Sequence, residues 1–278
     1  MKKKLFITLL AAFMLFTFIP KGLAHELFIH IEEDQETGEL RVDILWGHIR
    51  DFIDAGNYEN YKLQVRHPDG TVEPLPLEKI GVQARAYFQP TEEGEYVFWA
   101  ERKPSTYTPD GGETQLSLQM AKTTFYKGNG SETSSQPTDL ALEVIPTHSL
   151  SSFTTGEFKG QVLLEGMAVS DAAISAYGPQ GEVLEGVSDA DGHFELELSS
   201  RGEWLIKANV RTDDSGVLED EEYTKTSRTS TFLMNTENVE SQSGSGDVSM
   251  WSLILTALIA LLVGSSATLL ITGRKKKN

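Results

Sequence analysis

Short runs in which apolar and polar residues alternate constrain this chain most, because they recur from residue 26 to residue 234. Strict alternation is typical of half-buried β-strands, and no convincing window of helical period precedes the C-terminal end. The sequence therefore predicts an all-β fold. One run assigns side chains to opposite faces of a strand, with Tyr96, Phe98 and Ala100 on one face and Val97 and Trp99 on the other.

Two series of such runs indicate two β domains. The first occupies residues 25–127, and residues 128–138 are small and polar, which indicates a linker. The second occupies 139–235, with strands about 8–12 residues apart, and a Ser- and Gly-rich stalk at 236–250 follows. We expect two immunoglobulin-like β-sandwiches. Strands of the second are expected at 140–144, 161–164, 172–177, 182–187, 193–198, 204–210 and 223–233.

The first 24 residues have the pattern of a secretory signal. Three lysines precede the apolar stretch 5–19, and the small residues Gly22 and Ala24 stand at the positions that a signal peptidase requires. We expect cleavage after Ala24. His25 then becomes the first residue, with a free α-amine.

The other end predicts a membrane anchor. Residues 251–272 carry no charge, and as a helix they are about 33 Å long, which spans a hydrocarbon core of about 30 Å. The basic residues at 273–278 should stay in the cytoplasm by the positive-inside rule. We expect a single-pass protein of the cell membrane that contacts the lipid bilayer through 251–272 and has an extracytoplasmic N-terminal region.

The charge of the chain is concentrated between these ends. All 41 acidic residues and 16 of the 24 basic residues lie in 25–250, so this part carries −25. Such a field attracts cations and repels nucleic acid. No cysteine is present, which excludes disulfides, thiolate metal sites and a cysteine nucleophile. No nucleophile elbow, phosphate-binding loop or dinucleotide fingerprint occurs either, so we predict no catalytic residues and no enzyme.

The liberated His25 is the most informative single residue. Its α-amine and its ring can chelate one metal ion, and nitrogen donors suit Ni²⁺, Co²⁺ and Cu²⁺. His48 closes the alternating run 40–46 at a strand end, where it can serve as a second ligand or pack as a partly buried histidine. His30 is five residues from His25 and so points to the opposite face of a regular strand, and it joins the site only if that strand bulges.

Five short segments resemble a known family. They are Ala24–Phe28 at the cleavage point, Trp46–His48, and then 142–146, 188–194 and 202–206. Together they resemble the bacterial periplasmic component of cobalt/nickel (energy-coupling-factor-type) uptake systems, a family largely known as a domain of unknown function. The last two also resemble a carboxypeptidase regulatory-like domain. The resemblance implies a protein that binds Ni²⁺ or Co²⁺ through His25 and His48 for a membrane permease.

Three other functions fit the same features. An N-terminal histidine suits Cu²⁺ at least as well as Ni²⁺, so copper handling is an alternative. The paired sandwiches, stalk and anchor also suit a non-catalytic surface adhesion or scaffold module. An oxidative polysaccharide-cleaving enzyme also begins with histidine, but it needs a flat aromatic face, and Trp46, Trp99 and Trp204 fall in strand patterns instead.

Overall fold

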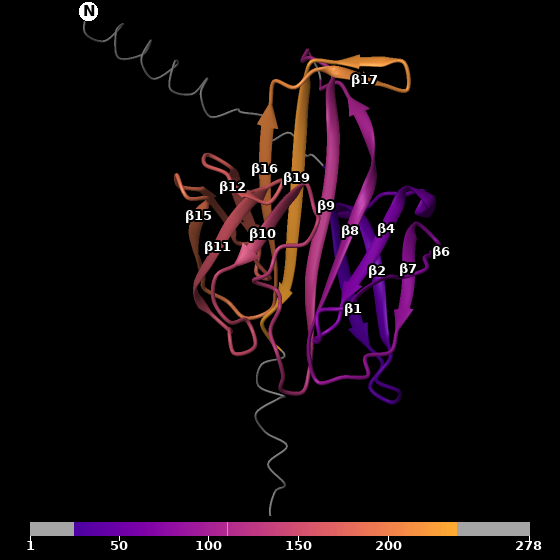
Figure 1. The fold of residues 1–278 in the computed structure, drawn as a ribbon, viewed down its shortest axis with the longest axis vertical. Coiled ribbons are helices and arrows are strands. Elements are labelled where there is room, and N and C mark those ends of the chain that lie inside the picture. Colours follow the sequence, from indigo (N-terminus) through magenta and orange to yellow (C-terminus); the bar gives the residue numbers. More distant parts are fainter. Residues whose placement is uncertain (1–24, 110, 238–278) are drawn as a thin grey trace, which may run out of the picture.

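The computed structural model describes residues 25–109 and 111–237, in which nearly all regular structure is β-sheet (Figure 1). This confirms the all-β prediction. One 3₁₀ turn, η1 (Tyr58–Asn60), interrupts the strands of the described part. The predicted signal, most of the stalk, the anchor and the basic tail lie outside the described residues. Among the residues that are described, none belongs to a helix of the length and apolarity that a membrane crossing needs.

An eight-stranded sheet forms the centre of the molecule (Figure 1). Its strands in spatial order are β14 (Val183–Val187), β13 (Ala173–Tyr177), β16 (Glu203–Thr212), β19 (Lys225–Asn235), β9 (Gln115–Lys127), β8 (Gly94–Tyr107), β4 (Tyr61–Arg66) and β5 (Val72–Pro74). All neighbours are antiparallel except β19 and β9, which pair in parallel. That pair joins the two predicted domains through one continuous sheet. Their boundaries stay a prediction.

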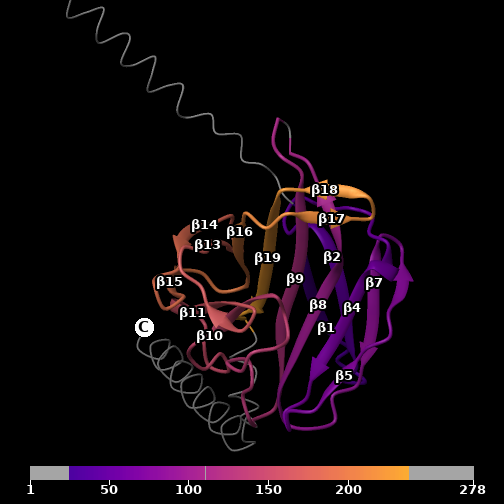
Figure 2. The same ribbon diagram turned by 45° about the horizontal axis from the view of Figure 1, so that its top comes forward.

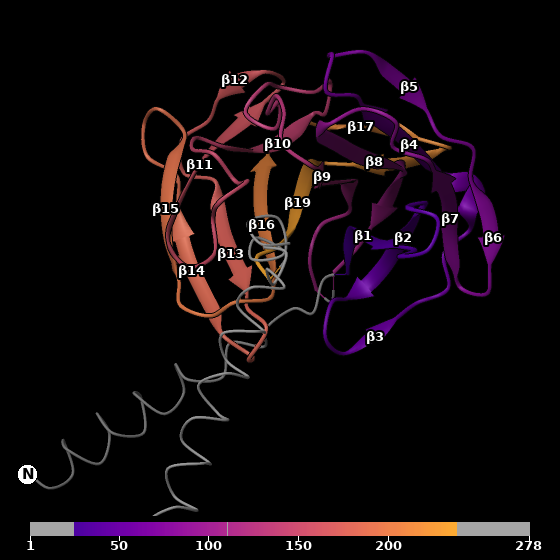
Figure 3. The same ribbon diagram turned by 90° about the horizontal axis from the view of Figure 1, so that it is seen from below.

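Two smaller sheets flank the central one, as the view from below shows (Figure 3). The first contains β1 (Glu26–Glu33), β2 (Leu40–His48), β7 (Gln83–Phe88) and β6 (Glu78–Ile80), with β3 (Phe52–Ile53) on β2. The second contains β10 (Leu142–Pro146), β11 (Gly156–Leu164) and β12 (Met167–Ala168), with β15 (His193–Leu198) on β11. A short hairpin of β17 (Gly216–Leu218) and β18 (Glu221–Tyr223) lies near the C-terminal end of β8 and the N-terminal end of β9 (Figure 2).

The alternation of β8 decides which sheet packs on which face. Tyr96, Phe98 and Ala100 are buried against the β1–β2 sheet. Val97 and Trp99 are buried in the cluster that the β10–β11 sheet covers. The predicted division of these five side chains is confirmed. The two smaller sheets thus cover opposite faces of the central sheet. We call the β1–β2 sheet with β4, β5, β8 and β9 the first sandwich, and the β10–β11 sheet with β13, β14, β16 and β19 the second.

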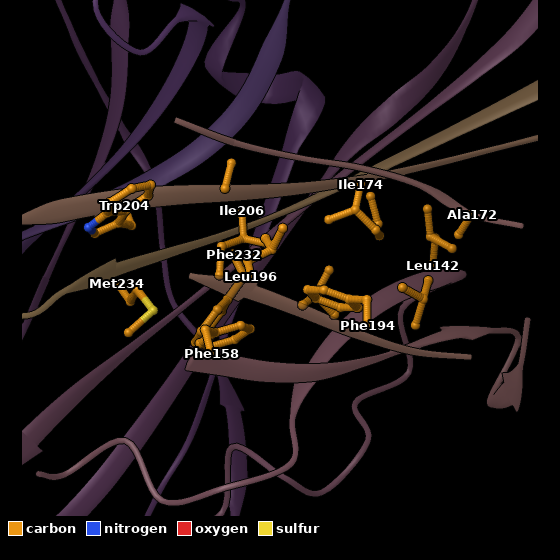
Figure 4. Close-up of a cluster of buried hydrophobic side chains, with 14 of the residues drawn as sticks. Leu142, Phe158, Ala172, Ile174, Phe194, Leu196, Trp204, Ile206, Phe232 and Met234 are labelled. Carbon is orange, nitrogen blue, oxygen red and sulfur yellow. The ribbon is translucent and has the colours of Figure 1, made fainter. Parts of the chain in front are cut away.

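The larger core lies between the central sheet and the β10–β11 sheet (Figure 4). Trp204 of β16 is fully buried there, and its indole Nε1 donates a hydrogen bond to Ser200 O at 2.9 Å. Phe158 and Phe232 pack with ring centres 6.5 Å apart. Burial of such aromatic side chains is the main stabilising term in a core of this kind.

The predicted linker at 128–138 is held against the central sheet by buried charges. Arg66 donates to Thr133 O and Gln136 O, both at 3.1 Å. Glu95 is fully buried and accepts from the backbone N–H of Ser134 at 2.6 Å. Because each charge satisfies backbone groups of the segment, the connection between the two sandwiches has one fixed path.

Candidate metal centre

The β1–β2 hairpin sets two of the predicted ligands side by side. Glu26 lies opposite Gly47, and Leu27 opposite Trp46, in an antiparallel register that runs without a break along β1. One step further, the same register places His25 opposite His48. The turn that fixes this register is closed by a hydrogen bond of 2.9 Å from the Asp34 N–H to Glu39 O.

Aromatic rings surround His25 at this end of the hairpin. The ring of His25 stacks on Trp46 with centres 5.5 Å apart, and lies 5.1 Å from the ring of His48. Phe52 of β3 contacts both imidazoles edge-on, at 5.9 Å from His25 and 5.0 Å from His48. Arg102 covers the ring of Trp46 at 4.6 Å. Stacking therefore restricts how the His25 ring can turn.

Each imidazole has its own carboxylate. Nε2 of His25 is hydrogen-bonded to Asp54. Nδ1 of His48 lies 3.3 Å from Oε2 of Glu26, whose other oxygen accepts a hydrogen bond of 2.8 Å from Nζ of Lys207. A carboxylate beside one ring nitrogen favours the tautomer that carries its hydrogen there, and leaves the other nitrogen with a free lone pair. The free nitrogens are then Nδ1 of His25 and Nε2 of His48.

Nε2 of His48 is buried and has no hydrogen-bond partner. Only 11% of the His48 side chain is exposed. Gly47, directly before it, has φ of +149°, and a Cβ at that position would lie 2.3 Å from Phe52 O. Only glycine therefore allows β3 to approach so closely. A buried nitrogen without a partner costs free energy unless a ligand uses its lone pair.

His30 lies on the other face of β1 and contacts the second sandwich. Its Nε2 is 3.2 Å from Oε1 of Glu203. The hydrogen bond to Glu203 is the main cause that raises the pKa of His30, against burial, which lowers it. β1 has no bulge, so the structure brings His25 and His48 together and keeps His30 apart from them.

Three residues of the site were not predicted from the sequence. Glu26 follows His25 directly, but the alternation puts Glu26 on the face of the strand opposite to that of Leu27 and Ile29. Asp54 belongs to a loop without a recognisable pattern, and Lys207 is 181 residues away from Glu26 in the chain. Burial is the largest single cause and lowers the pKa of Lys207. The hydrogen bond and charge of Glu26, together with Tyr177, outweigh it, and the pKa is raised. Glu26 had one signal, its place next to His25, but the alternation of the strand argued against it, and Asp54 and Lys207 had none.

Side chains alone do not complete a metal site here. In the part of the chain that the structure describes, no three histidine, aspartate or glutamate side chains form a group that could hold an ion. The pair of imidazoles needs a third donor. The α-amine of a cleaved chain would supply it, since the amine and Nδ1 of one histidine close a six-membered ring around a metal ion.

The fold and this cluster define an all-β protein that presents a histidine pair at the open end of a hairpin. A family model for the domain of unknown function DUF4198 matches residues 23–212, so the chain belongs to that family. The match confirms the predicted membership of a family known as a domain of unknown function. It includes both His25 and His48. No curated protein matches.

Solved structures resemble this chain only distantly. A Ca²⁺-stabilised adhesin that helps an Antarctic bacterium bind ice is 10% identical, with a TM-score of 0.20 over 76% of this chain and 50% of its own. The BSP domain of a biofilm-associated protein is 9% identical, with a TM-score of 0.21 over 78% of this chain and 52% of its own. The chain thus spans about half the length of these structures. Scores of this size carry no inference.

Proposed function

We propose that this protein binds a divalent transition-metal ion outside the cytoplasm and assists nickel or cobalt uptake by a membrane permease. In this proposal the signal is removed after Ala24, and residues 251–272 anchor the chain in the cell membrane. The two sandwiches are taken as immunoglobulin-like, and the second as carboxypeptidase-regulatory-like. The metal is cargo, and His25 and His48 hold it.

The unpartnered Nε2 of His48, next to the ring of His25, carries this proposal. Two imidazoles that bind one ion at about 2.0–2.1 Å have ring centres roughly 4.5–6.5 Å apart. The observed 5.1 Å lies within that range. Carboxylates on the outer nitrogens of metal-binding histidines fix the tautomer and the orientation of the ring, as Asp54 and Glu26 do here.

The chemistry of the donors favours a borderline divalent ion. Imidazole and amine nitrogens suit Ni²⁺, Co²⁺ and Cu²⁺, whereas soft Cu⁺ prefers sulfur. The chain has no cysteine. The excess of acidic residues in 25–250 would raise the local concentration of cations, and a tether would keep a bound ion near the permease.

Copper handling uses the same nitrogens and is the second candidate. Raw affinity favours Cu²⁺ over Ni²⁺ and Co²⁺ at a site of this kind. A deletion strain separates the two functions, because loss of uptake appears under nickel or cobalt starvation, whereas loss of copper handling appears under copper stress.

A scaffold module is favoured instead if no ion binds at micromolar concentration. An aromatic polysaccharide face would need Trp46, Trp99 and Trp204 on one surface. Trp99 and Trp204 are 3% and 0% exposed, and the partly buried ring of Trp46 lies against His25 and under Arg102.

Calorimetric titration with Ni²⁺ and Co²⁺ tests the proposal. The full-length chain is purified in detergent without a polyhistidine tag, and N-terminal sequencing establishes whether His25 is the first residue. We expect one site, which is lost when one residue is added before His25 and strongly weakened in His48→Ala. His193→Ala is the matched control, since His193 is the exposed first residue of β15. Binding that ignores both the free terminus and His48 would refute the mechanism.

A further inference from the structure

One face of β1 packs directly against β16 of the second sandwich. Glu26 contacts Lys207, Phe28 packs with Leu205, and His30 contacts Glu203. Residues two apart on β1 therefore meet residues two apart on β16. The first of these three contacts lies beside His48.

The carboxylate of Glu26 connects that contact to the proposed metal centre. Its Oε1 accepts a hydrogen bond of 2.8 Å from Nζ of Lys207, and its Oε2 lies 3.3 Å from Nδ1 of His48. The Glu26 side chain is 7% exposed and that of Lys207 is 17% exposed. Lys207 itself is held by the hydroxyl of Tyr177 at 3.0 Å, with the Tyr177 ring 5.1 Å away. Three side chains from two sandwiches thus form one buried chain of contacts that ends at His48.

We propose that Lys207 is a positioning residue of the metal centre, which orients Glu26 so that His48 presents Nε2 to the ion. This inference rests on the proposed function and adds that the second sandwich is part of the site. A carboxylate has two oxygens and a rotatable terminal bond. With Oε1 fixed by Lys207, Oε2 has one direction left, which is toward Nδ1 of His48.

The effect of losing Lys207 follows from this geometry. Without the ammonium group, Glu26 is free to rotate away from Nδ1, and the His48 ring loses the contact that selects its tautomer. Outer partners of metal-binding histidines typically change metal affinity by about 10- to 100-fold. A residue that served the fold alone would change stability and leave the bound ion's coordination as it was.

The test compares four variants of the full-length chain with the wild type, with Ni²⁺ as the titration probe and Cu²⁺ as the probe for electron paramagnetic resonance. Lys207→Met should weaken Ni²⁺ binding about 10- to 100-fold. Its Cu²⁺ spectrum should lose the nitrogen coupling of one imidazole and match that of His48→Ala. Lys207→Arg, which restores the cation, should recover binding to within a few-fold. Lys159→Met, which removes an exposed lysine of β11 outside this chain of contacts, is the control and should bind like the wild type.

The outcomes separate this inference from the proposed function. If the wild type with His25 as first residue binds no ion, both fail. If His48→Ala loses affinity while Lys207→Met binds like the wild type, only the role of Lys207 is overturned. The same conclusion follows if Lys207→Met weakens binding but keeps the coupling of both imidazoles. If Lys207→Met does not fold, Lys207→Gln takes its place with the same expected results and the same refuting ones.

Discussion

The buried ion pair between Lys122 and Glu143 allows a quantitative test of how the two sandwiches are joined. Lys122 lies on β9 and Glu143 on β10, and Nζ is 2.7 Å from Oε1. Their side chains are 1% and 2% exposed. Burial lowers the pKa of Lys122, and the charge of Glu143 opposes this. The pair therefore fixes the β10–β11 sheet on the central sheet through two charged groups that are shielded from solvent.

Replacing Lys122 with methionine leaves the carboxylate of Glu143 buried without its counter-ion. We expect Lys122→Met to lower the free energy of unfolding by about 3–5 kcal/mol, the usual cost of breaking a buried pair on one side. Glu143→Gln in addition removes the remaining charge. The amide oxygen can still accept from the Thr138 N–H, which donates to Oε2 of Glu143 at 2.8 Å. The double variant should therefore recover at least half of the loss.

Urea unfolding followed by tryptophan fluorescence measures both variants on the full-length chain. The slope of the free energy against urea should match between wild type and variants, so that the midpoints report stability alone. A loss below about 1 kcal/mol in Lys122→Met would refute the reasoning, because it would mean that water reaches Glu143. A double variant no more stable than the single one would refute it as well.

Two histidines give further predictions on pH. Burial is the main cause that lowers the pKa of His148, whose two ring nitrogens are buried without partners. The unfolded chain therefore binds a proton more readily than the folded one, and the free energy of unfolding falls as pH drops below about 6.5. His148→Phe, which can pack on Phe153 and Phe158, should reduce this loss of stability at acid pH in thermal melts between pH 5 and 8. Glu203 raises the pKa of His30, so that the pair stabilises the fold below about pH 6.5, and this contribution disappears as pH rises through the raised value. His30→Gln should lose only this pH-dependent stabilisation, which is less than about 1 kcal/mol because both side chains are about one-third exposed. An equal loss of stability at pH 5.5 and pH 8.5 would contradict this prediction.

Much of the strand layout could be read from the sequence. The segment 193–198 is predicted as a strand and is β15 with those bounds, and the segment 204–210 lies within β16. Predicted and observed ends differ elsewhere by a few residues, as in 223–233 against Lys225–Asn235. Alternation is a local property of the backbone, so it survives whatever the strand later packs against.

The candidate site was only half visible in the sequence. His25 and His48 were found because one follows a cleavage pattern and the other ends an alternating run. The hairpin register then decided that they meet. Asp54, in a loop without a pattern, and Lys207, on a strand of the other sandwich, could not be found this way, because their roles depend on which surfaces pack together.

The sequence by itself determined where several of the strands run and which of their side chains share a face, because these follow from a period of two residues along a single strand. It determined that Tyr96 and Trp99 lie on opposite faces of β8, and that His48 stands at a strand end. Only the tertiary structure decided that β19 pairs in parallel with β9 and that Lys207 reaches Glu26 across 181 residues. Pairing between distant strands is chosen by the burial of whole faces against each other, and no short stretch of sequence contains that information.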